Sequence, residues 1–286
     1  MSKKRKKWIV CFVIAVAVFA IWIYWGNRFI EVTHIKISDR FIPEQFDGFV
    51  IVHVSDLHNA EFGENQYDIL QKVRNANPDI IVITGDLVDS SHTNVGIAMK
   101  FVEGISKVAP VYYVSGNHEA WSESYPILRE QLEQNDIFVL DDKSVHLLQG
   151  ETAIQLIGLS DPDFMLQSDL FGEKEAMINH KLQEIVKDNS YYSILLSHRP
   201  ELIEAYSNYS IDLVLSGHAH GGQFRLPFIG GIIAPDQGFF PKYTAGMYTV
   251  GRTRMIVSRG LGNSIIPIRM NNRPELVVVE LNHLDE

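Results

Sequence analysis

The sequence predicts an α/β domain that follows one N-terminal transmembrane helix, and three observations lead to this expectation. Residues 8–27 form a run of 20 residues without a charge. From residue 48 onward, short apolar runs rich in β-branched residues alternate with segments of helical periodicity. These short runs are apolar at every position, which is typical of strands in a sheet covered by helices.

The first 30 residues have the composition of a membrane anchor. At about 1.5 Å per residue, a helix over residues 8–27 is roughly 30 Å long and matches the hydrocarbon core of a bilayer. Trp22, Tyr24 and Trp25 lie at its far end, where aromatic rings favour the membrane–water interface. Residues 3–7 are all basic, so the positive-inside rule predicts a cytoplasmic tail over residues 1–7. We therefore expect a single-pass protein of the cell membrane, with its body on the extracytoplasmic face.

A cleaved signal peptide and a buried core helix are the alternatives for this run. A signal peptide has an apolar region of about 7–15 residues, followed by a small-x-small cleavage site. Here the run is longer and ends in bulky aromatics, and Ala15-Val16-Ala17 comes too early for cleavage. An uncleaved signal anchor over residues 8–27 is the favoured interpretation.

The charge of the chain is unevenly distributed. Six of the 25 basic residues precede residue 31, which leaves 19 basic against 35 acidic residues and a net charge of −16. A body this acidic is not expected to bind long nucleic acid, which requires clustered Lys and Arg. Cys11 is the one cysteine, so no intrachain disulfide can form.

The chain after the anchor is predicted to hold one domain. Residues 28–47 mix polar and apolar positions and are expected to form a connector, and residues 48–286 the domain itself. Strands are expected over residues 50–55, 79–84, 111–115, 152–159, 192–196, 213–216, 247–250, 255–258 and 276–281. Helices are expected over residues 66–75, 94–106 and 125–135 and within 174–187.

Residue types that bind metals follow five of the predicted strands. The segments are Ser55-Asp56-Leu57-His58, Thr84-Gly85-Asp86-Leu87-Val88-Asp89, Ser115-Gly116-Asn117-His118-Glu119, Ser197-His198-Arg199-Pro200 and Gly217-His218-Ala219-His220-Gly221-Gly222-Gln223. The carboxyl ends of strands in an open α/β sheet meet at one crevice. We therefore expect the strand ends to bring together Asp56, His58, Asp86, Asn117, His198, His218 and His220. The glycines beside Asp86, Asn117 and His218 would let the backbone turn sharply.

These residue types suit two adjacent divalent cations. Oxygen donors and imidazoles together favour Mn, Fe or Zn over Ca or Mg, and Mn is the metal we expect. One carboxylate must bridge cations held about 3.5–4 Å apart, and Asp86 is the natural bridge.

The ordered set of motifs resembles the calcineurin-like metallophosphoesterase superfamily, whose blocks are D-x-H, G-D-x-x-D, G-N-H-[ED], a lone histidine and G-H-x-H. All five blocks occur in order, and the resemblance covers roughly residues 48–283. Residues 158–162, 218–223 and 258–262 are most similar to the small membrane-associated bacterial phosphodiesterase branch. That branch includes enzymes that cleave the pyrophosphate of UDP-2,3-diacylglucosamine. The resemblance implies a β-sandwich of two mixed sheets flanked by helices.

The resemblance also implies a role for each matched residue. On the family pattern, one cation is bound by Asp56, His58 and His220, the second by Asn117, His198 and His218, and both by Asp86. His118 falls at the position of the catalytic acid that protonates the leaving oxygen.

Several neighbouring residues are predicted to have supporting roles or none. Asp89 and Glu119 are expected to orient ligands rather than to bind metal. His53 is expected to be an ordinary strand histidine. For the arginines, substrate contact and structural ion pairing both stay open; these are Arg199, Arg225 and Arg273.

The expected activity is hydrolysis of a phosphodiester or pyrophosphate bond by attack of a metal-bound hydroxide. The substrate is expected to be a small-molecule or lipid-linked phosphoester. Two alternatives stay open: a phosphomonoesterase, protein phosphatases included, and a non-catalytic metal-binding module on the same fold. All eight motif positions are present, which favours the enzyme.

An apolar segment broken by Gly and Pro, residues 226–241, follows the last two predicted ligands. It is predicted either to pack as a hairpin on its own sheet or to form an exposed rim that faces the membrane. A connector of about 20 residues, at no more than ~3.5 Å each, would let such a rim reach the bilayer.

Overall fold

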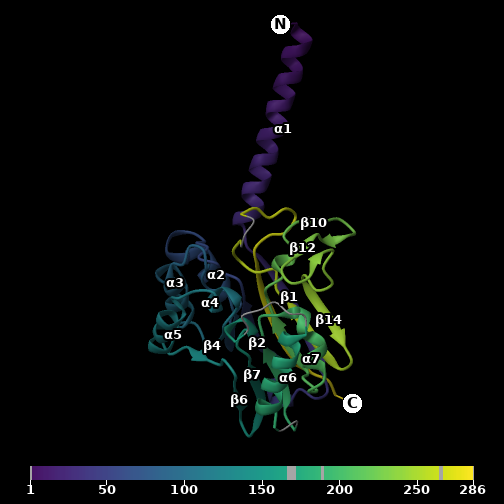
Figure 1. The fold of residues 1–286 in the computed structure, drawn as a ribbon. Coiled ribbons are helices and arrows are strands. Elements are labelled where there is room, and N and C mark those ends of the chain that lie inside the picture. The colour runs from purple at the N-terminus through teal and green to yellow at the C-terminus, as the bar shows by residue number, and fades with distance from the viewer. Residues whose placement is uncertain (1, 166–171, 188–189, 264–266, 286) are drawn as a thin grey trace.

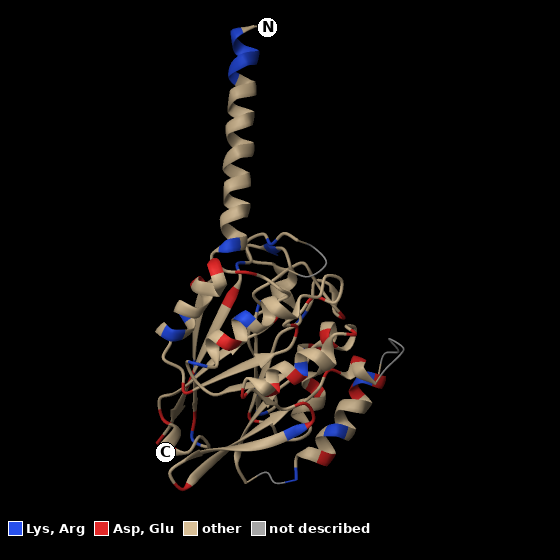
Figure 2. Ribbon diagram, turned by 90° about the vertical axis from the view of Figure 1, so that its left-hand side faces the viewer, with Lys and Arg blue, Asp and Glu red and all other residues tan. Residues whose placement is uncertain are grey.

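The computed structural model describes residues 2–165, 172–187, 190–263 and 267–285. A long helix, α1 (Lys3–Arg28), projects from a body built of two six-stranded sheets (Figure 1). Basic residues mark both ends of α1, and the stretch between them is uncharged (Figure 2). Among the described residues α1 is the one helix long and apolar enough to cross a membrane, and none of its apolar window is buried.

The first sheet is mixed and has the strand order β1-β16-β2-β3-β4-β5. Its strands are β1 (Glu31–Asp39), β16 (Glu275–His283), β2 (Phe49–Val54), β3 (Ile80–Thr84), β4 (Val111–Val114) and β5 (Phe138–Val139). Strands β2 to β5 are parallel, whereas β16 runs antiparallel to β2. The register pairs Glu31 with Glu275 and His53 with Val277. The carboxyl end of β2 therefore lies at the end of the body from which α1 leaves.

The second sheet is also mixed, with the order β14-β15-β9-β8-β7-β6. Its strands are β14 (Gly246–Val250), β15 (Thr253–Val257), β9 (Leu213–Ser216), β8 (Tyr192–Leu196), β7 (Thr152–Gly158) and β6 (Lys143–Gln149). The four central strands are parallel, and each edge strand is antiparallel to its neighbour. The predicted fold of two mixed sheets is confirmed.

Helices cover the outer faces of the sandwich (Figure 1). The first sheet carries α2 (Tyr67–Asn75), α3 (Val95–Ile105) and α5 (Tyr125–Gln134), and the second carries α6 (Glu173–Ile185) and α7 (Ile203–Ser207). Fully buried residues from both sheets, such as Ile51, Val82, Leu156 and Ile194, form the core between them. Burial on both faces explains why these strands are apolar at every position.

Short elements complete the body. α4 (Asn117–Ala120) is a single turn that follows β4. The 3₁₀ turns are η1 (Glu44–Phe46), η2 (Glu64–Gln66), η3 (Pro162–Phe164), η4 (Pro200–Leu202) and η5 (His220–Gly222). Two small hairpins, near the foot of α1 in Figure 1, comprise β10 (Arg225–Leu226), β11 (Gly230–Gly231), β12 (Ile233–Ala234) and β13 (Gly238–Phe239).

Residues 28–47 differ from the expected connector. Strand β1 occupies Glu31–Asp39 and pairs with β16 along its whole length, so only Phe29 and Ile30 separate α1 from the sheet. Ile37 is buried in the central core, while its neighbour Lys36 is exposed. Such alternation is the pattern of a half-buried edge strand, which a mixed composition conceals. The body is therefore held close to α1, without a long tether.

Candidate metal centre

The loops that follow β2, β3, β4, β8 and β9 meet at one end of the sandwich. They bring together all seven residues predicted as ligands, and every one of them is buried. The first group consists of Asp56, His58, Asp86 and His220, whose ligand atoms all lie within 4.8 Å of one another. His58 Nε2 lies 3.2 Å from His220 Nε2 and 3.4 Å from Asp86 Oδ2. Three imidazole and carboxylate ligand atoms thus face a common point.

The second group shares Asp86 with the first and adds His198 and His218. His198 Nε2 lies 3.2 Å from Asp86 Oδ2 and 3.1 Å from His218 Nδ1. Asn117 Oδ1 lies 3.0 Å from the same His198 nitrogen. Asp86 is thus placed between the two groups, where a bridging carboxylate would lie.

Five of the seven residues have a left-handed backbone, with φ between 45° and 65°. They are Asp56, His58, Asp86, His218 and His220. A residue other than glycine in this region costs on the order of 1–3 kcal/mol, and such strain persists only where the surrounding structure imposes it. Strained positions of this kind cluster at functional sites, so their concentration here marks the group as a site.

The predicted sharp turn is found at Gly85, whose φ is 87°, whereas Gly116 and Gly217 serve to let the ligand loops approach one another. A Cβ on Gly116 would overlap Asp86 Oδ1, and a Cβ on Gly217 would overlap Ser55 Oγ. Both glycines have ordinary negative or extended φ, so close approach, and not backbone freedom, requires them.

The protonation of the group fits cation binding. Burial lowers the pKa of His58 to about 3 and also lowers the pKa of His220, so both imidazoles are neutral and offer a lone pair. Burial likewise tends to lower the pKa of His198, but the Asp86 carboxylate outweighs it and raises that pKa to about 10. A cation at this point would take the place of the proton. Buried carboxylates among imidazoles, with one carboxylate shared, are a donor set that fits two divalent cations.

His118 lies in α4 at the edge of the first group. Its ring stands edge-on to His58, with the ring centroids 4.4 Å apart. Its Nδ1 accepts a hydrogen bond of 3.0 Å from the backbone N–H of Ser90. Because that nitrogen acts as the acceptor, the proton of the neutral ring lies on Nε2.

Glu119 and Asp89 occupy supporting positions. The Glu119 carboxylate accepts hydrogen bonds from the backbone N–H groups of Asp86 (2.7 Å), Gly116 (2.8 Å) and Val88 (3.2 Å). It thereby joins the loops after β3 and β4. Asp89 Oδ2 lies 3.8 Å from His58 Nδ1. The bonds of Glu119 fit the expected orienting role, whereas Asp89 forms no hydrogen bond with His58 and accepts from the backbone N–H groups of Ser91 and His92.

The remaining residues singled out from the sequence are structural or peripheral. His53 is buried and bonds Thr84 Oγ1 at 2.8 Å, as expected of a strand histidine. Arg199 is buried and donates to Asp161 at 2.6 and 2.9 Å, so it belongs to a structural ion pair. Arg225 donates to Gly221 O, and Arg273 lies outside the centre, at the foot of α1.

Sequence reasoning missed four residues that hold the ligand loops. Asp236 Oδ2 lies 3.3 Å from His218 Nε2 and also pairs with Arg199. Asp161 accepts a hydrogen bond from the guanidinium of the same Arg199 and so fixes its position. Arg269 and Asn272 support the loop of His220, where Asn272 Nδ2 donates to the His220 carbonyl at 2.7 Å. Each of these residues lies outside the ligand motifs; Asp161 alone falls in a stretch singled out from the sequence, residues 158–162, and no pattern there indicates this contact.

Comparison with known proteins agrees with this geometry. The sequence profile of the calcineurin-like phosphoesterase family matches residues 49–222, more than half of the chain. The chain is 31% identical to the uncharacterized metallophosphoesterase YkuE of Bacillus subtilis (strain 168), over 90% of this chain and 87% of that protein. It is 26% identical to the phosphodiesterase YaeI of Escherichia coli (strain K12), over 84% and 85% of the two chains. It is 28% identical to a transmembrane protein with metallophosphoesterase domain from Danio rerio, over 88% of this chain and 57% of that protein. The chain belongs to the calcineurin-like phosphoesterase family.

Proposed function

We propose that this protein is a two-metal phosphoesterase that hydrolyses a phosphodiester or pyrophosphate bond. The observation that carries the proposal is the pair of ligand groups that share Asp86, built largely on left-handed backbone. The phosphodiesterase name of the Escherichia coli relative supports the diester as the substrate class. Seven ligands and His118 in the positions of the family motifs favour catalysis over a purely metal-binding role.

Each residue has a defined part in the proposed reaction. Asp56, His58 and His220 would hold one cation, Asn117, His198 and His218 the second, with Asp86 on both. Manganese is the metal we favour for this mixture of oxygen and nitrogen donors. Bound there, the cations would supply a water of lowered pKa as the nucleophile and would neutralise charge on the phosphoryl oxygens.

His118 supplies the proton or hydrogen bond that the leaving oxygen needs. The Ser90 N–H donates to Nδ1, so in the neutral ring Nε2–H is the group that would donate to the leaving oxygen. Glu119, bonded to three backbone N–H groups, keeps the loops of Asp86 and His118 in register. The chain therefore positions its own proton donor. The proposed reaction needs no covalent intermediate.

We further propose that α1 anchors the protein in the cell membrane, with residues 1–7 in the cytoplasm and the body on the outer face. The basic residues at the N-terminal tip and the uncharged span of α1 support this orientation (Figure 2). The carboxyl end of β2, which leads to Asp56 and His58, lies at the same end of the body as α1. The metal centre would then face the bilayer.

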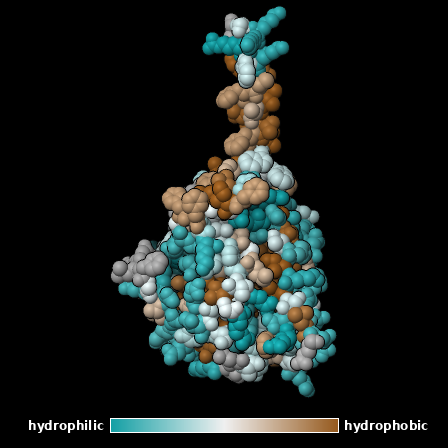
Figure 3. Space-filling view, turned by 90° about the vertical axis from the view of Figure 1, so that its right-hand side faces the viewer, coloured by the Kyte–Doolittle hydropathy of each residue, from teal (hydrophilic) through white to brown (hydrophobic). Residues whose placement is uncertain are grey.

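An exposed apolar rim, within residues 226–241, supports the proposal that the substrate carries a lipid group. Apolar side chains gather where α1 joins the body (Figure 3). Phe239 and Phe240 are 73% and 68% exposed, and Phe228 and Ile229 in the preceding hairpin are exposed too. Exposed apolar patches of this kind mark ligand or membrane surfaces. The exposed rim is thus the alternative that this arrangement favours over a packed hairpin.

The proposal is tested with the full chain, reconstituted with Mn, Fe or Zn and assayed on three substrates. These are bis(p-nitrophenyl) phosphate as a diester, p-nitrophenyl phosphate as a monoester, and a lipid-linked pyrophosphate. We expect metal-dependent turnover, faster on the diester and on the pyrophosphate than on the monoester. Faster turnover of the monoester would favour the phosphomonoesterase alternative, and no turnover with any metal would contradict the enzyme.

Two pairs of variants test whether the apolar rim takes part in selecting the lipid-linked substrate. Phe239→Ser with Phe240→Ser should slow turnover of the lipid-linked substrate and spare the soluble diester. The control is Phe41→Ser with Phe138→Ser, two exposed phenylalanines that lie outside the rim. Equal effects of the two pairs on the lipid-linked substrate would show that the rim has no part in its selection.

A further inference from the structure

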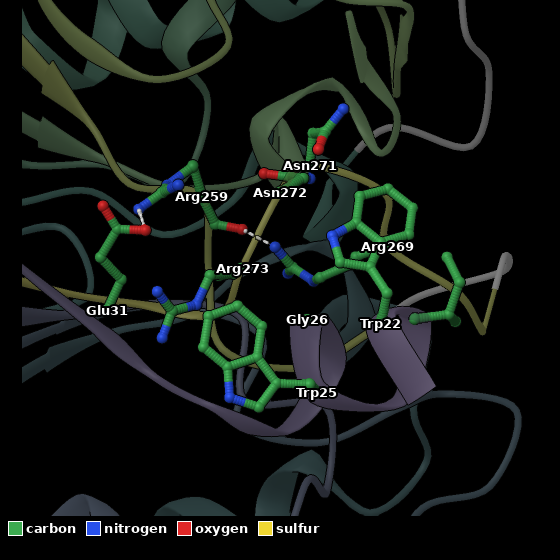
Figure 4. Close-up of a pocket in the computed structure, with 10 residues that line it drawn as sticks. Trp22, Trp25, Gly26, Glu31, Arg259, Arg269, Asn271, Asn272 and Arg273 are labelled. Atoms are coloured by element: carbon green, nitrogen blue, oxygen red, sulfur yellow. Dashed lines mark hydrogen bonds and ion pairs between the residues drawn. The ribbon is translucent and has the colours of Figure 1, made fainter. Parts of the chain in front are cut away.

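A pocket of about 230 Å³ lies where α1 meets the body (Figure 4). One wall comes from the last turns of α1 and the other mainly from the chain before β16; the lining residues are Trp22, Ile23, Trp25, Gly26, Glu31, Arg259, Arg269, Asn271, Asn272 and Arg273. The uncharged run of α1 ends at Asn27. When α1 spans a bilayer, the pocket therefore lies at the depth of the lipid headgroups.

The pocket carries an excess of positive charge. Arg259 pairs with both Glu275 at 2.9 Å and Glu31 at 3.3 Å, so the three arginines of the lining exceed these two carboxylates by one charge. Arg269 is almost fully buried and donates to oxygens that carry no charge, the carbonyls of Arg259 and Gly262 among them. Over the described part of the chain, no carboxylate lies within ion-pair distance of Arg269.

Arg273 is the second arginine of the lining without an ion pair. Its Nε donates to Phe29 O at 3.2 Å, and its guanidinium lies 4.3 Å from the centre of the Trp25 ring. It too has no ion-pair partner among the residues described. Of these two arginines, Arg269 is only 1% exposed, so its charge is the more strongly removed from water. A buried positive charge is unfavourable unless an anion accompanies it.

We propose that this pocket binds the phosphate group of an anionic membrane lipid. Arg273 would supply the planar fork that matches phosphate oxygens. Arg269 would contribute its charge, since its Nε, Nη1 and Nη2 already donate within the protein. Trp22 and Trp25 provide the aromatic surface that packs against lipid at the membrane–water interface. Glu31, the one carboxylate among the described lining residues, lies against Arg259 and forms no ion pair with Arg269 or Arg273.

The site also bears on the metal centre. Arg269 Nη2 lies 3.4 Å from His220 Nδ1, and Asn272 bonds the His220 carbonyl at 2.7 Å. A lipid bound here would stabilise Arg269 and Asn272, which support the His220 loop. It would also keep the metal centre turned toward the membrane. This inference depends on α1 spanning the bilayer and not on hydrolysis, so the two proposals can fail separately.

The test uses the full chain in nanodiscs of equimolar phosphatidylglycerol and phosphatidylcholine, with the retained lipid identified by native mass spectrometry. Wild type should retain phosphatidylglycerol in preference to phosphatidylcholine. Arg273→Gln should weaken that retention by about 10–100-fold, the effect of losing one hydrogen bond between charged groups. Gly26→Leu should weaken it as well, because a Cβ there meets no heavy atom within 4 Å and the longer side chain fills the pocket.

The control is Arg40→Gln, which removes the same charge just beyond the other end of β1 and should retain the lipid as wild type does. Equal retention of both lipids by wild type, or wild-type retention by both pocket variants, would overturn the proposal. A further arm adds inorganic phosphate at millimolar concentration. Displacement of the lipid by phosphate alone would identify free phosphate as the ligand and contradict the lipid source.

Discussion

Asn27 and Arg269 are joined by two hydrogen bonds although 242 positions separate them in the sequence. Asn27 Nδ2 donates to the Arg269 carbonyl at 3.0 Å, and the Arg269 N–H donates to Asn27 Oδ1 at 2.8 Å. The guanidinium of the same arginine lies 3.4 Å from His220 Nδ1. A single residue thus links the foot of α1 to the candidate metal centre, and the two regions form one structural unit.

Loss of this link should destabilise the junction. Asn27→Ala removes both hydrogen bonds, and we expect it to cost about 1–3 kcal/mol. For a chain of this size that corresponds to a fall in Tm of roughly 2–12 °C, measured by thermal unfolding of the full chain in detergent. The control is Asn179→Ala, which removes a side-chain bond to the carbonyl four positions earlier in α6 and no link between elements. An equal shift in both variants would contradict the linking role.

His118 should affect chemistry without affecting metal binding. His118→Ala is expected to leave the metal content intact and to lower kcat by about 10²–10⁴-fold, because the leaving oxygen loses its donor. The loss should shrink for diesters with good leaving groups, which need little protonation. Steady-state kinetics over a leaving-group series measures this dependence.

The matched control for His118 is His92→Ala, an exposed histidine in the loop after β3. It should behave as wild type. If His118→Ala slows good and poor leaving groups equally, the acid role is wrong and His118 only positions the substrate.

Gly116 should tolerate no side chain. A Cβ in Gly116→Ala would overlap Asp86 Oδ1, so the carboxylate must move away from the point that both ligand groups share. We expect a loss of bound metal together with about 1–3 kcal/mol of stability. Gly96→Ala in α3 is the control, since a Cβ there meets only Asn94 Oδ1, at 3.3 Å. Wild-type metal content in Gly116→Ala would show that Asp86 does not need its observed position.

The sequence predicts the centre of the fold better than its edges. Strands such as β3 and β8 are buried on both faces, so an unbroken apolar run followed by a histidine or a carboxylate identifies both the strand and the candidate ligand. The edge strands β1 and β6 have one exposed face, and their mixed composition hides them. Their positions depend on pairing with β16 and β7, which no local pattern specifies.

The supporting residues of the site are unpredictable for a similar reason. Asp236 and Arg269 reach His218 and His220 from separate loops, and only the packing of the whole sandwich brings them there. The position of the metal centre beside the foot of α1 also needs the tertiary structure. It follows from β16, which lies between β1 and β2 and sets their register.

In the proposed mechanism two cations share Asp86, and turnover depends on both. The most direct measurement is the metal content of Asp86→Ala and of wild type, by inductively coupled plasma mass spectrometry, with the rate on bis(p-nitrophenyl) phosphate measured on the same samples. Each cation loses a ligand in the variant, and the repulsion between the cations is no longer offset by a shared carboxylate. We predict two cations per chain and turnover in wild type, and loss of both metal and turnover in Asp86→Ala. Two bound cations with undiminished turnover in Asp86→Ala would contradict the account.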